Sequence, residues 1–178
     1  PGLSMNGVAA EITRCVLERE DKVRILDADA LNIIAAEHID YKGSNEGKII
    51  ITPHIMEMSR LTGKTVSDIK EHMIESAKEY AIQHSCICIL KDARTVVTDG
   101  QKVYINCTGN DGMSTGGSGD VLTGLIAGMA AIGLDAFDAA CLSVYVHGKA
   151  GDLAAQQKGR TGMTASDIAE AIAYVLKR

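Results

Sequence analysis

Short aliphatic runs alternate with longer amphipathic segments along this chain, and that alternation restricts the fold more than any other feature. The runs have the length and the β-branched content of buried strands, which are bounded by polar or turn residues. We predict strands at residues 23–26, 48–51, 86–90, 95–98 and 102–105. The last two flank Asp99-Gly100, a pair typical of a tight hairpin turn. Strands that alternate with helices favour parallel pairing, so we predict an α/β fold with a largely parallel sheet.

The amphipathic segments predict the helices. They lie at residues 4–19, around residues 31–34, from Thr65 onward, after the Gly-rich segment 115–120, at 136–156 and at 166–176. In the first helix, the apolar stripe expected to face the core consists of Val8, Ile12, Val16 and Leu17. We found no repeat, no low-complexity tract and no linker, so we expect one domain spanning residues 1–178.

Two threonines carry the spacing of helix N-caps. Thr65 precedes a long helix and has Asp68 three residues later, and Thr164 stands in the same relation to Asp167. The apolar stripe predicted for the long helix consists of Val66, Ile69, Met73, Ala77 and Tyr80.

Composition limits the class of partner. The chain has 178 residues, a net charge of −5 and only 3% aromatic residues, which argues against a nucleic-acid or membrane-surface partner. Cys86 and Cys88 lie two apart in a predicted strand, and we interpret them as buried small residues in a protein of the reducing cytoplasm. The chain opens on Pro1-Gly2-Leu3 without an initiator Met, so we expect it to be cut within a loop.

The Gly-rich run Thr115-Gly116-Gly117-Ser118-Gly119-Asp120 leads directly into an apolar helical stretch. Glycines let backbone N–H groups converge on a ligand, and a helix N-terminus adds unpaired donors that favour a phosphate. An acid at this point is consistent with a base that deprotonates a hydroxyl while the amides steady a transferring phosphoryl group. The alternative is a Gly-rich turn in which Asp120 only complements the helix dipole.

Other polar residues follow the predicted strands, where ligands of open α/β sheets bind. Asp27 and Asp29 follow the first strand and form either an acid–base pair or a polar clamp for the substrate; for Asp29 alone, the N-cap of the next helix is favoured. His54 follows the second strand and is interpreted as a substrate contact, and Glu57 as an outer-shell holder of water or Mg²⁺ or a first-turn dipole partner. Lys91 ends the third strand, where it meets a nucleotide phosphate or only solvent.

The remaining histidines are interpreted as structural or surface residues, and two common nucleotide-binding motifs are absent from the sequence. His147 is interpreted as a packed or capping residue, and the other three as surface residues: His38, His72 and His84. The chain has no G-x-x-x-x-G-K-[ST] phosphate loop and no G-x-G-x-x-G after its first strand. Asp120 stands where a nucleophilic serine elbow around Ser118 would require glycine, which argues against a serine hydrolase.

Taken together, several motifs resemble those of the ADP/ATP-dependent NAD(P)H-hydrate dehydratases. They are LDADALN at 26–32, TPH at 52–54 followed by Glu57-Met58, GNDGMSTGGSGDVLTG at 109–124, His147-Gly148 with Ala150-Gly151-Asp152, and MTASDI at 163–168. Pro1-Gly2-Leu3 is similar to the end of that family's G-P-G-L turn. The resemblance runs in one order along the whole chain and implies a three-layer α/β/α ribokinase-like fold whose first third this sequence lacks.

The resemblance also implies an activity and roles for residues. The family repairs hydrated NADH and NADPH: ADP or ATP, with Mg²⁺, phosphorylates the ring hydroxyl, and the departure of phosphate restores the dinucleotide. Asp120 would be the base, and Gly117, Ser118 and Gly119 the anion hole. Gly2, His54 and Asp120 would contact the hydrated dinucleotide. The nucleotide would contact Lys91, Asp92, Ala93, Arg94, Thr95 and Gly119. The resemblance further implies a homo-oligomer.

This sequence departs from the family pattern at three places. Ile55-Met56 replaces the usual Pro-Gly after His54, which is expected to start the helix earlier and to reshape the pocket beside His54. Asp92 replaces a usual Gly and brings a negative charge close to the predicted nucleotide phosphates; Ser114 for Ala is a minor change. Two alternatives stay open: a ribokinase-like kinase of a vitamin precursor or sugar, whose product would retain the phosphate, and a non-catalytic nucleotide-binding module.

Overall fold

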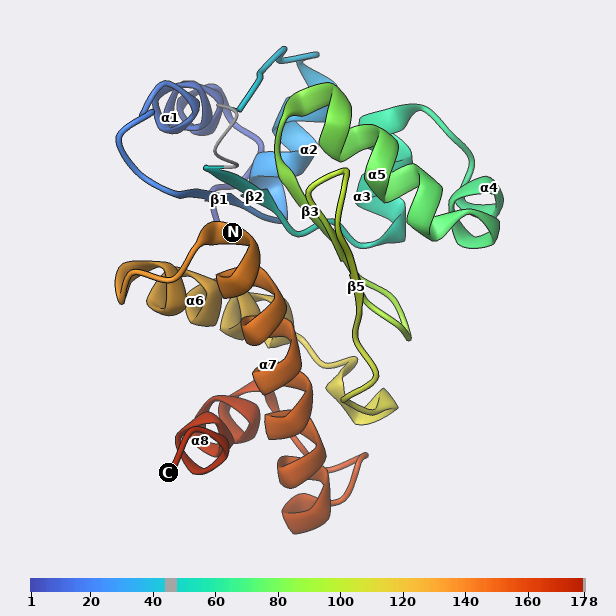
Figure 1. The fold of residues 1–178 in the computed structure, drawn as a ribbon, viewed down its shortest axis with the longest axis vertical. Helices are drawn as coiled ribbons and strands as arrows, with labels where there is room; N and C mark the ends of the chain where they lie inside the picture. Colours follow the sequence, from blue (N-terminus) through green and yellow to red (C-terminus); the bar gives the residue numbers. More distant parts are fainter. Residues whose placement is uncertain (44–47, 178) are drawn as a thin grey trace. The chain divides into compact units, whose positions relative to one another are not determined.

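The computed structural model describes residues 1–43 and 48–177. Its helices are α1 (Gly7–Leu17), α2 (Asp29–Ala36), α3 (Ile55–Thr62), α4 (Val66–Glu71), α5 (Met73–His84), η1 (Asp111–Met113, a 3₁₀ turn), α6 (Ser118–Ala131), α7 (Ala136–Lys158) and α8 (Ala165–Val175). Its strands are β1 (Arg24–Leu26), β2 (Ile49–Ile51), β3 (Ile87–Leu90), β4 (Val96–Thr98) and β5 (Val103–Ile105). Figure 1 traces these elements in chain order.

The described chain forms two compact units. The first contains Pro1–Asp92 and Val96–Tyr104, and the second contains Ala93–Thr95 and Ile105–Arg178. The single domain that we predict over residues 1–178 stays a prediction.

The sheet has the order β1-β2-β3-β4-β5. β1, β2 and β3 pair in parallel and β4 pairs antiparallel to β3, so the prediction of a largely parallel sheet is confirmed. Every residue of β2 and β3 is buried, as expected for strands of an α/β sheet that are covered on both faces. The predicted hairpin is also confirmed, and Gly100 adopts the positive φ that its turn requires.

Helices of the first unit pack their apolar stripes on one face of this sheet. Leu31 from α2, Met58 from α3 and Tyr80 from α5 join one buried cluster with sheet residues such as Ile51 and Leu90. Cys86 and Cys88 lie in the same cluster, which confirms their interpretation as buried residues. Burial raises the pKa of the Cys86 thiol to about 12, so it stays protonated and acts as a packing group.

The first helix is shorter than predicted, and its predicted stripe is wrong. Asn6 caps the helix, and its side chain accepts a hydrogen bond from the Ala9 N–H at 2.9 Å. The buried residues of α1 are Ala9, Ala10 and Thr13, whereas Val8, Ile12 and Val16 are exposed and Leu17 is partly buried. Small side chains let a helix approach its neighbour closely. The helix therefore buries the face with small side chains and not the more hydrophobic face that was predicted.

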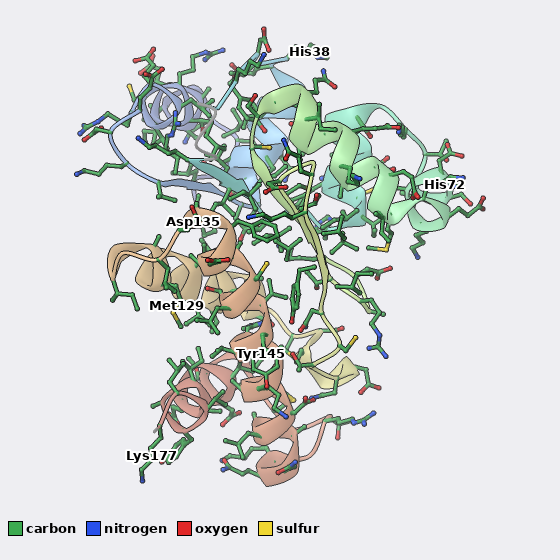
Figure 2. All side chains as sticks on the ribbon, viewed as in Figure 1. His38, His72, Met129, Asp135, Tyr145 and Lys177 are labelled. Atoms are coloured by element: carbon green, nitrogen blue, oxygen red, sulfur yellow. The ribbon has the colours of Figure 1, made fainter. Side chains whose placement is uncertain are left out.

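The long helix predicted from Thr65 is two helices. The backbone leaves helical geometry at His72 (φ −129°, ψ 49°), so α4 ends there and α5 begins. Figure 2 labels His72, which is exposed at this junction, and His38, which is also exposed, as predicted. The surface prediction for His84 is wrong, because His84 is half-buried and its ring stacks with those of Tyr41 and Tyr80.

In the second unit, α7 packs against both α6 and α8. Buried Ala150 and Ala154 of α7 meet Ile168 and Ala171 of α8 in one cluster. Both predicted caps are confirmed as full capping boxes, Thr65 with Asp68 and Thr164 with Asp167. None of the helices within residues 1–43 and 48–177 has the length and apolar character of a membrane span.

Candidate active site

In the first unit, the predicted polar residues gather where β1, β2 and β3 end. The backbone ladder continues past the strands: the Thr52 N–H donates to the Leu26 carbonyl at 3.1 Å, and the Lys91 N–H donates to the Pro53 carbonyl at 2.8 Å. His54 and Lys91 pair as a parallel bridge. This register places Asp27, Thr52 and Lys91 side by side at the carboxyl edge of the sheet, as expected for ligand-binding residues of an α/β fold.

Asp27 is the centre of this group. Its Oδ1 accepts hydrogen bonds from Thr52 Oγ1 at 2.6 Å and from Lys91 Nζ at 3.0 Å. The Asp27 side chain is 2% exposed, so its carboxylate is buried, whereas the Lys91 side chain is 22% exposed. The interpretation of Lys91 as a merely solvated residue is therefore wrong.

His54 and Glu57 form a capping box at the start of α3. His54 Nδ1 accepts from the Glu57 N–H at 3.1 Å, and Glu57 Oε2 accepts from the His54 N–H at 2.8 Å. Because Nδ1 is an acceptor, the neutral ring carries its proton on Nε2, which lies 3.4 Å from Glu57 Oε1. Glu57 is buried and His54 is half exposed, so the ring remains accessible to a ligand.

Asp29 has a role that the sequence analysis missed. The N-cap residue of α2 is Ala28, with an unusual φ of 50°, and no side chain caps the helix, so the N-cap prediction for Asp29 is wrong. Its carboxylate instead accepts the Ser4 N–H at 2.8 Å. Ser4 and Gly2 both have positive φ, so Asp29 fixes the turn that carries the predicted substrate contact Gly2.

The predicted nucleotide contacts after Lys91 lie on the surface. Asp92, Ala93 and Arg94 are exposed between β3 and β4, and Thr95 is half-buried. The Thr95 carbonyl accepts the Asn106 N–H at 2.9 Å, which ties the end of this loop to the segment after β5.

In the second unit, the Gly-rich run ends at the first turn of α6. Gly117 is the N-cap in left-handed geometry (φ 87°), which allows the chain to enter the helix sharply. The Ser118 N–H donates to the Thr115 carbonyl, and the first helical bond runs from the Val121 N–H to the Gly117 carbonyl. The amides of Gly119 and Asp120 lie between these two bonds, at the positive end of the helix dipole.

Asp120 is the third residue of α6 and is exposed. Ser118 is buried, and its Oγ lies 3.5 Å from Nε2 of the buried His147 on α7. The interpretation of His147 as a packed residue is confirmed.

A loop before the Gly-rich run is fastened to α7 by Asp152. Its Oδ2 accepts the Gly109 N–H and its Oδ1 accepts from Asn110 Nδ2, both at 3.1 Å. Gly148 and Gly151 face this loop, and a Cβ at either would overlap Thr108 or Met113. This role of Asp152 was not predicted from the sequence. Two glycines inside a helix were the available signal, since they mark a close backbone approach.

The predicted site residues are divided between the units. Gly2, His54, Glu57, Lys91 and Asp92 belong to the first unit, whereas Ala93, Arg94, Thr95, the anion-hole residues and Asp120 belong to the second. The structure brings Lys91 to Asp27 and Thr52 and His54 to Glu57, and it joins Ser118 to His147. Their assigned roles remain predictions. Within the described ranges, no three side chains of His, Cys, Asp or Glu gather as a metal-binding group.

Comparisons with known proteins give one consistent result. The chain is 46% identical to the bifunctional NAD(P)H-hydrate repair enzyme of Moorella thermoacetica over 99% of its own length and 33% of that protein. Its structure matches the ADP/ATP-dependent NAD(P)H-hydrate dehydratase of Bacillus subtilis, co-crystallised with ATP and Mg²⁺, with a TM-score of 0.87 and 32% identity. This match covers 98% of the chain and 63% of that structure.

A ribokinase-like protein of Enterococcus faecalis matches with a TM-score of 0.81 and 26% identity, over 98% of the chain and 60% of that structure. The ribokinase-like α/β fold is thereby confirmed. The chain spans about a third of the length of the curated Moorella relative and less than two thirds of the solved structures. A family model described as NAD(P)H-hydrate dehydratase matches residues 1–174, so the chain belongs to the NAD(P)H-hydrate dehydratase family.

Proposed function

We propose that this chain catalyses the nucleotide-dependent dehydration of hydrated NADH or NADPH, which repairs the damaged dinucleotide. Family membership and the likeness to the Bacillus subtilis dehydratase support this assignment. The observation that carries it is the start of α6, where an exposed carboxylate follows a left-handed glycine and two helix-end amides. A base and an anion-binding backbone are thus offered by one short segment.

The proposed reaction has two steps. Asp120 accepts the proton of the ring hydroxyl as the hydroxyl oxygen bonds to the terminal phosphorus of ADP or ATP, and the shortened nucleotide leaves. The C–O bond then breaks with its electron pair on the departing phosphate, and the adjacent ring carbon releases a proton, so that the reduced nicotinamide ring is restored. Phosphate is a far better leaving group than hydroxide, which is why a kinase-type site can drive a dehydration.

The backbone around Gly119 supplies the anion hole in this proposal. Its amide and that of Asp120 point out of the first helical turn, where donors and the helix dipole stabilise a transferring phosphoryl group. Gly117 sets the entry angle of the helix, and Ser118 anchors it through His147.

Binding residues complete the proposal. Gly2 and His54 contact the hydrated dinucleotide, supported by the half-exposed ring of His54 and by the tether from Asp29 to the turn at Gly2. The nucleotide contacts Lys91, the exposed loop at 92–95 and Gly119.

Mg²⁺ fits this site through water. Mg²⁺ commonly keeps several waters and takes its direct ligands from one or two carboxylates and substrate phosphates. The buried Glu57 carboxylate has one oxygen bonded to the His54 N–H and the other beside its ring, which suits contact with metal-bound water rather than direct ligation. When bound, the metal would neutralise charge on the phosphates.

We also propose a cytoplasmic homo-oligomer without nucleic-acid or membrane partners. The five cysteines suit a reducing compartment, and the net charge of −5 supplies no basic field for a polyanion. Ile132, Tyr145 and Tyr174 expose large apolar surfaces of the second unit, and such side chains are common at protein interfaces; Figure 2 labels Tyr145 on α7.

Asp120→Asn tests the base assignment. With hydrated NADPH, ADP or ATP and Mg²⁺, we expect NADPH recovery to fall about 10²–10⁴-fold, with nucleotide binding retained, because only the proton acceptor is lost. Asp138→Asn is the matched control, since Asp138 is an exposed acid at the third position of α7. It should recover NADPH like the unmodified chain. Full activity of Asp120→Asn would refute the role of Asp120.

A further inference from the structure

The contacts of Lys91 point to residues that act through it. Asp27, Thr52 and Lys91 each follow a different strand of the parallel part of the sheet, and one oxygen, Asp27 Oδ1, accepts from both of the other side chains. Thr52 is completely buried, and Asp27 is nearly so. The rigid ladder at the strand ends therefore fixes the carboxylate, and the carboxylate in turn fixes the end of the lysine side chain.

Physical chemistry explains why such an arrangement suits a ligand-binding lysine. A buried carboxylate requires donors and an opposite charge, which Thr52 and Lys91 supply. A free lysine side chain samples many rotamers, and a bound anion would otherwise have to order it. The ammonium has three N–H donors, and the bond to Asp27 occupies one of them. The Lys91 side chain is 22% exposed, so it is only partly enclosed by the protein and the other donors remain for a ligand.

We propose that Asp27 and Thr52 are positioning residues that hold the Lys91 ammonium in place for a phosphate of the nucleotide. This inference rests on the proposed function, in which Lys91 belongs to the nucleotide site. Asp27 touches neither substrate nor nucleotide, and its whole effect on nucleotide binding passes through Lys91. The pair differs from a purely structural ion pair in one measurable respect: its loss matters to the nucleotide only while Lys91 is present.

A double-mutant cycle on ADP binding tests the proposal, with calorimetric titration of ADP into the full chain. We expect Lys91→Met to weaken ADP binding about 10- to 100-fold and Asp27→Asn to weaken it about 10-fold. The double variant should bind no more weakly than Lys91→Met alone, because Asp27 has no other route to the ligand. Effects that multiply in the double variant would overturn the positioning role.

Thr52 provides a second cycle that spares the buried charge, in case Asp27→Asn fails to fold. Thr52→Val removes only the hydroxyl at nearly constant volume and should weaken ADP binding a few-fold, whereas Thr52→Ser should restore it. On the Lys91→Met background, Thr52→Val should have no effect on ADP affinity. Equal weakening of ADP by Thr52→Val with and without Lys91 would again contradict the proposal.

Turnover separates this inference from the proposed function. Non-additive ADP binding in a chain that recovers no NADPH would support the positioning role and refute the dehydratase. NADPH recovery together with additive effects on ADP binding would support the dehydratase and refute the positioning role. A chain that binds neither ADP nor ATP would overturn both. In an active chain, Asp27→Asn should raise the KM for ADP and leave the KM for hydrated NADPH unchanged.

Discussion

At the scale of single residues, several polar side chains of the candidate site carry a structural contact beside their proposed role. His54 caps α3 and also presents a half-exposed ring. Asp29 is the first residue of α2, and its carboxylate accepts a hydrogen bond from the Ser4 N–H. An alanine substitution at such a position mixes the loss of a ligand contact with the loss of local structure. The substitutions that test a role must therefore preserve the structural contact.

His54→Asn is such a substitution. Asparagine is a good N-cap and retains the acceptor for the Glu57 N–H, so α3 should keep its start, whereas His54→Ala would also cost about 1 kcal/mol of stability. We expect the KM for hydrated NADPH to rise about tenfold, with ADP binding unchanged. Steady-state kinetics with each substrate varied checks this. His72→Asn, at an exposed N-cap that makes no side-chain cap bond, is the control. Equal weakening of both substrates would contradict a dinucleotide contact.

The sequence was sufficient to select the polar residues of the candidate site, but it did not predict most of the contacts that they make. The strand ends identified Asp27, His54 and Lys91, and the Gly-rich run identified Asp120. The bond from Lys91 to Asp27 joins residues 64 positions apart, and only the parallel register reveals it. Ala28, with its positive φ, displaced Asp29 from the cap position, and no local pattern signals that geometry.

At the scale of helices and strands, short sequence patterns correctly predicted the features that depend on residues close together in the chain. The capping boxes at Thr65 and Thr164 and the Asp99-Gly100 hairpin depend on neighbours in sequence, and all three are confirmed. The buried face of α1 and the break at His72 depend on packing instead. Ala9, Ala10 and Thr13 are less hydrophobic than the exposed Val8 and Ile12, so hydrophobicity pointed to the wrong face.

Two glycines in helix interiors should respond to substitution by alanine with stability changes of opposite sign. Gly148 on α7 meets the Thr108 side chain and carbonyl, so the Cβ of Gly148→Ala should push the loop away and cost about 1–3 kcal/mol. Gly128 on α6 has no atoms within the space of a new Cβ, so Gly128→Ala should stabilise the chain by about 0.5–1 kcal/mol. Urea unfolding of both variants checks the signs. Stabilisation by Gly148→Ala would mean that the loop does not pack against α7.

The capping boxes also predict a response to acid. The hydrogen bond from the Thr164 side chain lowers the pKa of Asp167, as Thr65 lowers that of Asp68. A lowered pKa means that the folded state favours the carboxylate. The stabilisation is therefore complete above the unfolded pKa of ~4 and is lost as the pH falls through the lower folded pKa. In the Asp167→Asn variant, the melting temperature should therefore decrease less as the pH falls through that range. Parallel curves for the two proteins would exclude this contribution.

At the scale of the whole molecule, the family assignment rests on motifs spread from Pro1 to the last helix, and a family model matches 1–174. No single motif would have been sufficient, since Gly-rich turns and strand-end lysines occur in many folds. The proposed roles are divided between the two compact units, with the base and anion hole in one and the dinucleotide contacts at Gly2 and His54 in the other. The order of motifs was predictable from sequence, whereas the division into units follows from contacts distant in sequence.

The stoichiometry of the reaction distinguishes a dehydratase from a small-molecule kinase and from a binding module. Hydrated NADPH is incubated with the chain, Mg²⁺ and ADP or ATP, and NADPH absorbance and inorganic phosphate are followed together. A dehydratase should release one phosphate for each NADPH recovered, and no NADPH should form without nucleotide. Consumption of the nucleotide with the phosphate retained on an organic product would identify a small-molecule kinase instead, and nucleotide binding without turnover would identify a binding module.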